Sequence, residues 1–141
     1  VWTWCWMFWL AHIRGYFIAG SLSLILAAQF LLYFSYAVIS STVVLATKNL
    51  PKTFGFIALY GGSSPSFSGI TLPLNNAPAF TQFWSMIIPY TPYAKLQTEQ
   101  WVIGSDLYIS LLPFGILVIF SGLYFALSVR LLKKNALELC Q

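Results

Sequence analysis

Charged residues are scarce in this sequence, and their scarcity indicates the class of protein. Asp, Glu, Lys and Arg make up 7% of the 141 residues, whereas a soluble globular domain has about 25%. A surface this poor in charge cannot keep a folded chain dispersed in water. With 59% of its residues hydrophobic, the chain is predicted to lie in a lipid bilayer. The basic residues form no run that suits a nucleic acid, which excludes that class of partner.

Residues with reactive or metal-binding side chains are also few. The two cysteines, Cys5 and Cys140, are far apart and predict no disulfide framework. The single histidine, His12, has no Cys, Asp or Glu at a spacing that suits a metal ion or a haem. The three acidic residues form no catalytic pair, and no phosphate-binding loop is present. We therefore expect no catalytic residues, no metal and no cofactor, so the chain is not an enzyme by itself.

The first residues are apolar and aromatic. The sequence opens at Val1 with "VWTWCWMFWLA", which has no initiator methionine and no charged region ahead of the apolar run. This pattern is not that of a signal peptide. We interpret residues 1–12 as the end of a membrane span whose beginning lies upstream of Val1.

Two long uncharged runs predict two crossings of the bilayer. The run from Gly15 to Thr47 has 33 uncharged residues, and a helix needs about 20 to cross the hydrocarbon core. We place this crossing at 21–46, after an approach segment at the interface. The second run has 23 uncharged residues and predicts the last span at 107–130. Pro113 is expected to bend that span because proline removes a helical hydrogen bond.

The basic residues predict the orientation of these spans. They form two close clusters: Lys48 and Lys52 in one, and Arg130, Lys133 and Lys134 in the other. Basic residues at the ends of spans mark the cytoplasmic side of a membrane. If both clusters are cytoplasmic, an even number of crossings separates them, so one more span is needed before the last. We place it at 53–68, and we assign residues 131–141 to a cytoplasmic tail.

The stretch "SPSFSGITLPLNNAP" interrupts the apolar sequence after that third span. Its prolines, glycine and asparagines exclude a continuous helix, so residues 69–105 are predicted to form short helices that are external or re-entrant. Gly69 permits a positive φ or a close approach of the backbone, and Pro73 and Pro78 are expected to start or stop short helices. An ordinary external loop is the alternative. The apolar residues that favour a buried re-entrant element are Phe80, Phe83, Trp84, Met86, Ile87 and Ile88. Whether residues 77–94 cross or re-enter stays open.

Small and polar residues inside the spans suggest contacts between helices. Gly15, Ala19, Ser23 and Ala27 recur every four residues and predict one small-residue face of a helix, and Gly122 and Ala126 offer a shorter one. Such a face packs helices within one chain or forms a seam between two subunits. Gln29 is expected to face the bundle interior, where it forms a helix–helix hydrogen bond or lines a substrate path. Lys95 and Glu99 stand four residues apart and suit a surface ion pair.

The segment "FSGITLPLNNAPAFTQFWSMIIPYTPYAKLQTEQWVIGSD" resembles the C-terminal signature of permease subunits of type-two ABC exporters. The family pattern is an SG-x-x-x-P turn, a second proline, and an apolar stretch that ends in P-x-T/R-x-Y. A helix and the final span follow. The residues that match this pattern are Ser68, Gly69, Pro73, Pro78, Pro89, Thr91 and Tyr93.

The resemblance implies an architecture, partners and a location. It implies an all-α polytopic membrane protein, a helical bundle with a broken re-entrant or external helical hairpin before the last span. The matching residues would cap a substrate path on the outer side. The partners implied are the bilayer, an ABC ATPase subunit or domain that carries the ATPase activity, and a second permease subunit in a homo- or heterodimer. The location implied is the bacterial plasma (inner) membrane, with several spans and a cytoplasmic C-terminus.

Two other functions fit parts of the sequence. A structural or assembly subunit of a membrane complex, with no transport path of its own, would also be apolar and helical. It would not need the interrupted segment before the last span. A redox subunit would need paired histidines within its spans, and the sequence has only His12. The substrate of an exporter does not follow from the sequence.

Overall fold

A computed structural model describes residues 2–15, 18–69 and 77–139, and side chains within 5–15, 18–69 and 77–135. The described part of the chain is mostly helical and contains no strands. Its elements, in chain order, are α1 (Trp2–His12), α2 (Leu22–Thr47), α3 (Leu50–Phe67), α4 (Ala79–Ile87), α5 (Tyr90–Thr98), the π-helical turn η2 (Glu99–Ile103) and α6 (Leu107–Leu139).

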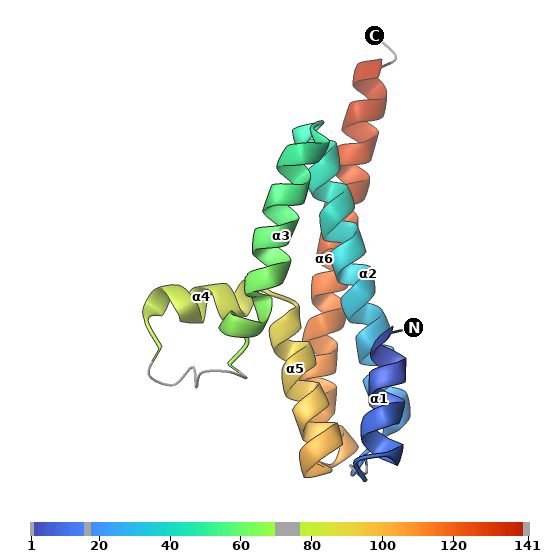
Figure 1. Cartoon of the computed structure of the whole chain (residues 1–141). Coiled ribbons are helices and arrows are strands. Elements are labelled where there is room, and N and C mark those ends of the chain that lie inside the picture. The colour runs from blue at the N-terminus through green and yellow to red at the C-terminus, as the bar shows by residue number, and fades with distance from the viewer. Residues whose placement is uncertain (1, 16–17, 70–76, 140–141) are drawn as a thin grey trace.

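Helices α2, α3, α5 and α6 form three columns, one of which is interrupted, and α1 is a separate helix (Figure 1). The helices α2 and α6 run in the same direction and pack along their length. The third column runs in the opposite direction, with α3 against one end of α2 and α5 with η2 against the other end. The short helix α4 leaves the column at the break and extends away from the bundle. The predicted interruption of the chain before the last span is thus a break within one column.

A tight turn reverses the chain between α2 and α3. Lys48 adopts a left-handed conformation with φ 49°, and its N–H donates to the carbonyl of Val44 at 2.9 Å. The Asn49 side chain then accepts from the Lys52 N–H at 3.2 Å and so caps α3. Pro51 suits the first turn of α3, where a backbone N–H has no helical partner. These local bonds set α3 antiparallel to α2.

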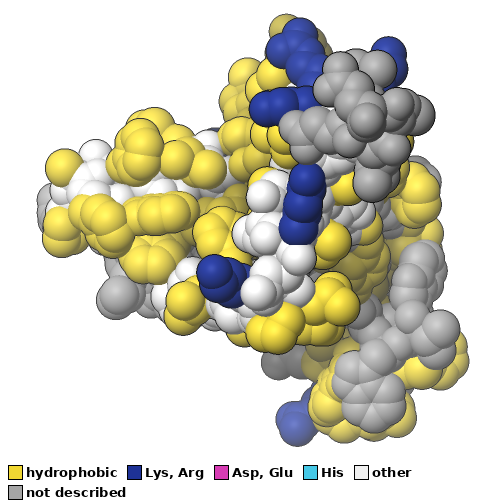
Figure 2. Space-filling view, turned by 90° about the horizontal axis from the view of Figure 1, so that it is seen from above, with side chains coloured by type: hydrophobic (Ala, Val, Ile, Leu, Met, Phe, Trp, Pro, Cys, Tyr) yellow, Lys and Arg dark blue, Asp and Glu magenta, His cyan; other side chains and the backbone are white. Residues whose placement is uncertain are grey.

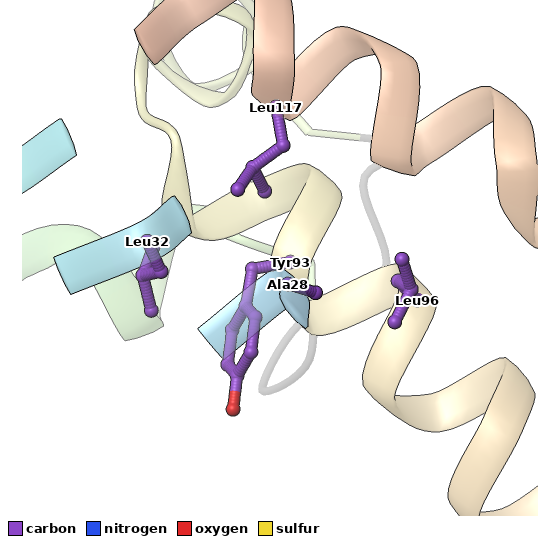
Figure 3. Packing of buried hydrophobic residues seen from close by; sticks show 5 residues of the cluster. All are labelled: Ala28, Leu32, Tyr93, Leu96 and Leu117. Atoms are coloured by element: carbon purple, nitrogen blue, oxygen red, sulfur yellow. The ribbon is translucent and has the colours of Figure 1, made fainter. Parts of the chain in front are cut away.

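The core lies where α2, α5 and α6 meet. Ala28 and Leu32 of α2 pack with Tyr93 and Leu96 of α5 and with Leu117 of α6 (Figure 3). Because few of the large apolar side chains are enclosed in this way, most of the outer faces of α2 and α6 remain exposed and apolar. Among the described residues, α2 and α6 are long and apolar enough to cross a membrane, by length and composition. The more diluted α3, with its glycines and serines, is not among them.

The bounds of the two apolar helices agree with the predicted crossings. The crossing predicted at 21–46 corresponds to α2, and the span predicted at 107–130 corresponds to the first part of α6. Pro113 lies inside α6, and the helix continues past it. The helix also continues past Arg130 into the segment predicted as a tail.

Both basic clusters lie at one end of the bundle, called here the basic end. The Asn135 side chain on α6 donates to the carbonyl of Leu45 on α2 at 2.9 Å, which joins the two helices close to their basic residues. Seen from this end, Lys and Arg side chains gather over the bundle (Figure 2). Asp106, at the start of α6, marks the opposite end. The two clusters are therefore on the same side, as their predicted separation by an even number of crossings requires.

The predicted small-residue face is wrong in part. Gly15 and Ala19 precede α2, so they do not share a helical face with Ser23 and Ala27. Ser23 and Ala27 are themselves exposed on α2. The close approach occurs at another place, since a Cβ added at Gly104 would lie 2.9 Å from that of Ala19. On α6, Gly122 and Ala126 are also exposed, so neither pair packs two helices of the described chain together.

The segment predicted to be buried before the last span is only partly buried in this chain. Ile88 and Pro89 are enclosed at the corner between α4 and α5. Phe80, Phe83 and Met86 are 64%, 60% and 70% exposed, because α4 extends away from the bundle. The described chain therefore does not bury these apolar side chains.

Candidate functional site

The end of α3 carries the first two residues of the predicted cap. The Ser68 hydroxyl donates to the carbonyl of Pro65 at 2.7 Å, which satisfies a carbonyl that has lost its helical partner. Gly69 follows with φ 81°, a left-handed conformation that residues with a side chain rarely adopt. The predicted positive φ at Gly69 is therefore confirmed. Together the two residues end α3.

Pro78 starts α4. Its carbonyl accepts from the N–H of Thr81 at 2.9 Å and from that of Gln82 at 3.1 Å. The prediction that Pro78 starts or stops a short helix is thus confirmed. Pro73, which was predicted for the same role, lies outside the described residues.

The corner between α4 and α5 is tied to two columns at once. The hydroxyls of Tyr60 on α3 and Tyr124 on α6 both donate to the Ile87 carbonyl, at 3.3 and 3.2 Å. Ile88 and Pro89 are buried directly after it. The sequence analysis missed both tyrosines, because residues so far apart along the chain show no periodicity that would pair them. The two hydroxyls fix the position of the corner relative to α3 and α6.

Thr91 and Tyr93 follow this corner on the first turns of α5. The N–H of Thr91 donates to the Ile88 carbonyl at 3.2 Å, while its hydroxyl is buried without a hydrogen-bond partner. Tyr93 is part of the core, where it acts as a packing side chain.

Three of the predicted cap residues meet in one crevice beside the break. The crevice has a volume of about 530 Å³, and Ser68, Gly69 and Thr91 line it. Polar and charged side chains from α5 and η2 also line it, namely Lys95, Thr98 and Glu99. Pro78, Pro89 and Tyr93 do not line it. This combination of hydroxyls with one ammonium and one carboxylate can hydrogen-bond a polar group, and nothing in it resembles a nucleophile with its base.

A buried polar cluster lies at the end of the bundle opposite the basic end. The Gln100 amide donates to Ser110 at 2.9 Å and to the Ser105 carbonyl at 3.0 Å, and its oxygen accepts from the Ser21 N–H at 2.8 Å. Ser110 in turn donates to the Glu99 carboxylate at 2.9 Å. These residues, with Gly20 whose N–H donates to the Gln100 carbonyl at 2.8 Å, are called here the polar clasp.

The polar clasp replaces an interaction that was expected on the surface. Glu99 was considered as an ion-pair partner of Lys95, yet its carboxylate is buried and bonded to Ser110. The reason is η2, since a π-helical turn rotates the residues that follow α5 relative to an α-helix. The polar clasp joins the segment before α2, η2 and α6 by hydrogen bonds that no spacing in the sequence indicated.

Gln29 is buried in α2, 3% exposed, as expected for an amide that faces the bundle interior. The expected hydrogen bond to another helix is not formed among the described residues. The amide nitrogen donates instead to the Tyr33 hydroxyl at 3.4 Å, one turn along the same helix, and the amide oxygen has no partner. Gln29 thus presents an unused acceptor inside the bundle.

Comparison with known proteins gives no relative for this chain. No family model, no curated protein and no solved structure matches it. Within the described residues, no three His, Cys, Asp or Glu side chains lie close enough to hold a metal ion together. The function proposed below therefore rests on the geometry and on the sequence resemblance alone.

Proposed function

We propose that the chain is the C-terminal part of a permease subunit of an ATP-driven ABC exporter. The observation that carries the proposal is the interrupted column, in which α3 ends inside the bundle and α4 leaves from the gap before α5 completes the column. A helix that only anchors a protein in the membrane does not require such a break. Non-helical backbone at membrane depth is tolerated only where protein or a water-filled cavity satisfies its polar groups. The two tyrosine hydroxyls on the Ile87 carbonyl supply part of that requirement.

The proposed membrane placement follows from the exposed apolar faces and the basic end. Helices α2 and α6 cross the bilayer, α3 enters from the same side as the end of α2, and α5 with η2 completes its column. The basic end is cytoplasmic because its exposed lysines and arginine belong on that side. The crevice beside the break and the polar clasp then lie toward the outer side.

The break gives the proposed exporter a way to couple helix movements. Because Tyr60 and Tyr124 hold one carbonyl from two different columns, a shift of α6 against α3 must move the corner between α4 and α5. The crevice lined by Ser68, Gly69 and Thr91 lies along α5 and changes shape with it. An ATPase subunit or domain, together with a second permease subunit, would drive that movement. The substrate leaves on the outer side of the cap.

The deciding experiment is co-purification of the full-length protein in a mild detergent. An exporter permease carries an ATP-hydrolysing partner in equal ratio, which quantitative mass spectrometry and an ATPase assay of the purified complex would reveal. If the protein comes alone, or with a complex that does not hydrolyse ATP, the exporter proposal is wrong. A structural or assembly subunit would then fit better.

A further inference from the structure

An apolar groove follows one face of α3 toward α4. Its volume is about 320 Å³, and its lining is almost wholly apolar and aromatic. The residues that line it are Phe56, Leu59, Tyr60, Ser63 and Phe67 of α3 and Phe80 and Trp84 of α4. A second cavity of about 280 Å³ extends inward between α2 and α6 and shares Phe56, Tyr60 and Trp84 with the groove. The two adjoin at these shared side chains, and a ligand of the groove must itself be apolar.

The direction and length of the groove match an acyl chain. It follows α3 from Phe56 to Phe67, about 16 Å at 1.5 Å per helical residue. That is about half of the roughly 30 Å hydrocarbon core of a bilayer. Phe67 and Phe80 meet edge to face at 6.4 Å between ring centres, close to the end of the groove where α4 begins. The groove thus runs along the helix axis for about one leaflet, as a lipid tail does.

A basic side chain lies at the other end of the groove. Lys52 is exposed and stands one helical turn before Phe56, on the same face of α3 as Tyr60, Ser63 and Phe67. Lys52 follows the α2–α3 turn, which lies at the basic end of the bundle. In the membrane placement proposed above, lipid headgroups begin at this level. One face of α3 therefore carries a cation followed by an apolar channel, the two parts that complement an anionic phospholipid.

We propose that the groove binds one phospholipid from the leaflet at the basic end. Its acyl chain lies between α3 and α4 and contacts Phe56, Ser63 and Trp84, while its phosphate pairs with Lys52. The lipid covers Phe80 on α4, which the chain itself leaves exposed. This inference rests on the bilayer placement proposed above but not on transport.

The test compares retained lipid in matched variants of the full-length protein. The protein is reconstituted in vesicles of equal phosphatidylglycerol and phosphatidylcholine, extracted in mild detergent, and its bound phospholipid is counted by mass spectrometry. Wild type is expected to retain phosphatidylglycerol over phosphatidylcholine by about fivefold, the effect of one cation near an anionic headgroup. Ser63→Phe fills the groove and is expected to remove most of the retained lipid. Ser66→Phe, on the exposed side of the same helix, is expected to retain it.

The charge is tested separately. Lys52→Gln is expected to abolish the preference for phosphatidylglycerol while some phospholipid stays bound, and Lys133→Gln, also exposed at the basic end, is expected to keep the preference. Leu59→Trp is a second groove-filling variant in case Ser63→Phe does not fold, since Leu59 is 77% exposed and loses little packing. Equal lipid retention by Ser63→Phe, Leu59→Trp and Ser66→Phe, or an unchanged preference in Lys52→Gln, would overturn the proposal. Neither outcome depends on whether an ATPase co-purifies.

Discussion

Single residues at the polar clasp show how closely the segment before α2 approaches η2. The N–H of Gly20 donates to the Gln100 carbonyl at 2.8 Å, and a Cβ added at Gly20 would lie 2.9 Å from that same oxygen and overlap the Gln100 amide. Hydrogen is therefore the only side chain that fits at position 20 without a backbone shift. Gly104 repeats the arrangement one turn away, where an added Cβ would meet Ala19. Two glycines thus allow two stretches of backbone to lie against each other.

Gly20→Ala is expected to destabilise the protein by about 1–3 kcal/mol, the usual cost of forcing a methyl group into a filled site. The measurement is thermal unfolding of the purified protein in detergent, followed by circular dichroism. Gly62→Ala is the matched control, because an added Cβ at Gly62 meets nothing within 4 Å. Since alanine favours a helix over glycine by about 0.5–1 kcal/mol, the control is expected to be slightly stabilised. Equal melting temperatures for the two variants would contradict this account of Gly20.

Gln100→Leu is expected to destabilise the protein more than a surface glutamine substitution does. The change leaves the Ser21 N–H and the Ser105 carbonyl without the partners they have now, and each buried unpaired group costs about 1–3 kcal/mol. Gln97→Leu, one turn earlier and partly exposed, is the control. Hydrogen exchange of the Ser21 amide reports the same loss locally. Unchanged protection of that amide in Gln100→Leu would show that the polar clasp does not hold this end together.

Little at the residue scale could be predicted from the sequence. Gly69 was expected to permit a positive φ or a close approach, and Pro78 to start or stop a short helix, because each role depends on the backbone preference of one residue. Gly69 has φ 81°, and Pro78 starts α4. The polar clasp was not, since Gln100 and Ser110 meet only after η2 has rotated one toward the other. Gln29 was expected to bond another helix, whereas it bonds the Tyr33 side chain within its own helix. Contacts between side chains depend on helix rotation, which composition does not encode.

At the scale of elements, the corner between α4 and α5 is held by a shared acceptor. Two tyrosines from different helices donate to the single carbonyl of Ile87, and a carbonyl oxygen has lone pairs for both. If one donor is lost, the carbonyl keeps the other. If both are lost, it keeps none. The energetic effects of the two hydroxyls should therefore not be additive.

Tyr60→Phe and Tyr124→Phe are each expected to cost less than about 1 kcal/mol, because the remaining hydroxyl still satisfies the Ile87 carbonyl. The double variant is expected to exceed the sum of the two by about 1–2 kcal/mol. Unfolding free energies of the four proteins in a double-mutant cycle give this coupling. Tyr90→Phe, whose hydroxyl has no such role at the corner, serves as the control. Strictly additive costs would mean that the two hydroxyls act independently.

Which elements could be predicted depended on how uniform the sequence is. Helix α2 begins and ends within one residue of the crossing expected at 21–46, because Lys48 ends a long uncharged run and the run exceeds the length of one crossing by an approach segment. The prediction for the approach segment was wrong, because small residues at every fourth position suggest a helical face even where no helix includes all of them. Gly15 and Ala19 precede α2. The apolar residues of α4 were expected to be buried in the bundle, but Phe80 and Phe83 remain exposed because α4 turns away from it.

At the scale of the whole molecule, the two basic clusters share one end although more than half of the chain separates them. The Asn135–Leu45 hydrogen bond sets this arrangement, and Figure 2 shows the gathered charge from that side. In the membrane placement proposed above, this distribution puts the basic end in the cytoplasm. Asp106 and the polar clasp then face the other side.

Thiol labelling of intact cells tests that orientation. In a full-length protein in which every cysteine, including Cys5 and Cys140, is replaced by serine, Asp106→Cys is expected to react with a membrane-impermeant reagent added outside, because Asp106 is exposed at the end opposite the basic end. Lys134→Cys is expected to react only after the cells are opened, since it lies at the basic end. Labelling of both positions from outside, or of Lys134→Cys alone, would contradict the proposed orientation. The cysteine-free parent protein controls for background.

The pairing of α2 with α6 has a consequence for how the protein is made. Ser35 bonds Ser121, 86 residues later, and Leu45 bonds Asn135, 90 residues later. The Ile87 carbonyl receives its second donor, Tyr124, 37 residues further on. During synthesis the face of α2 that packs against α6 therefore stays uncovered until α6 has been made. Any factor that delays α6 leaves that face of α2 open to proteases for longer.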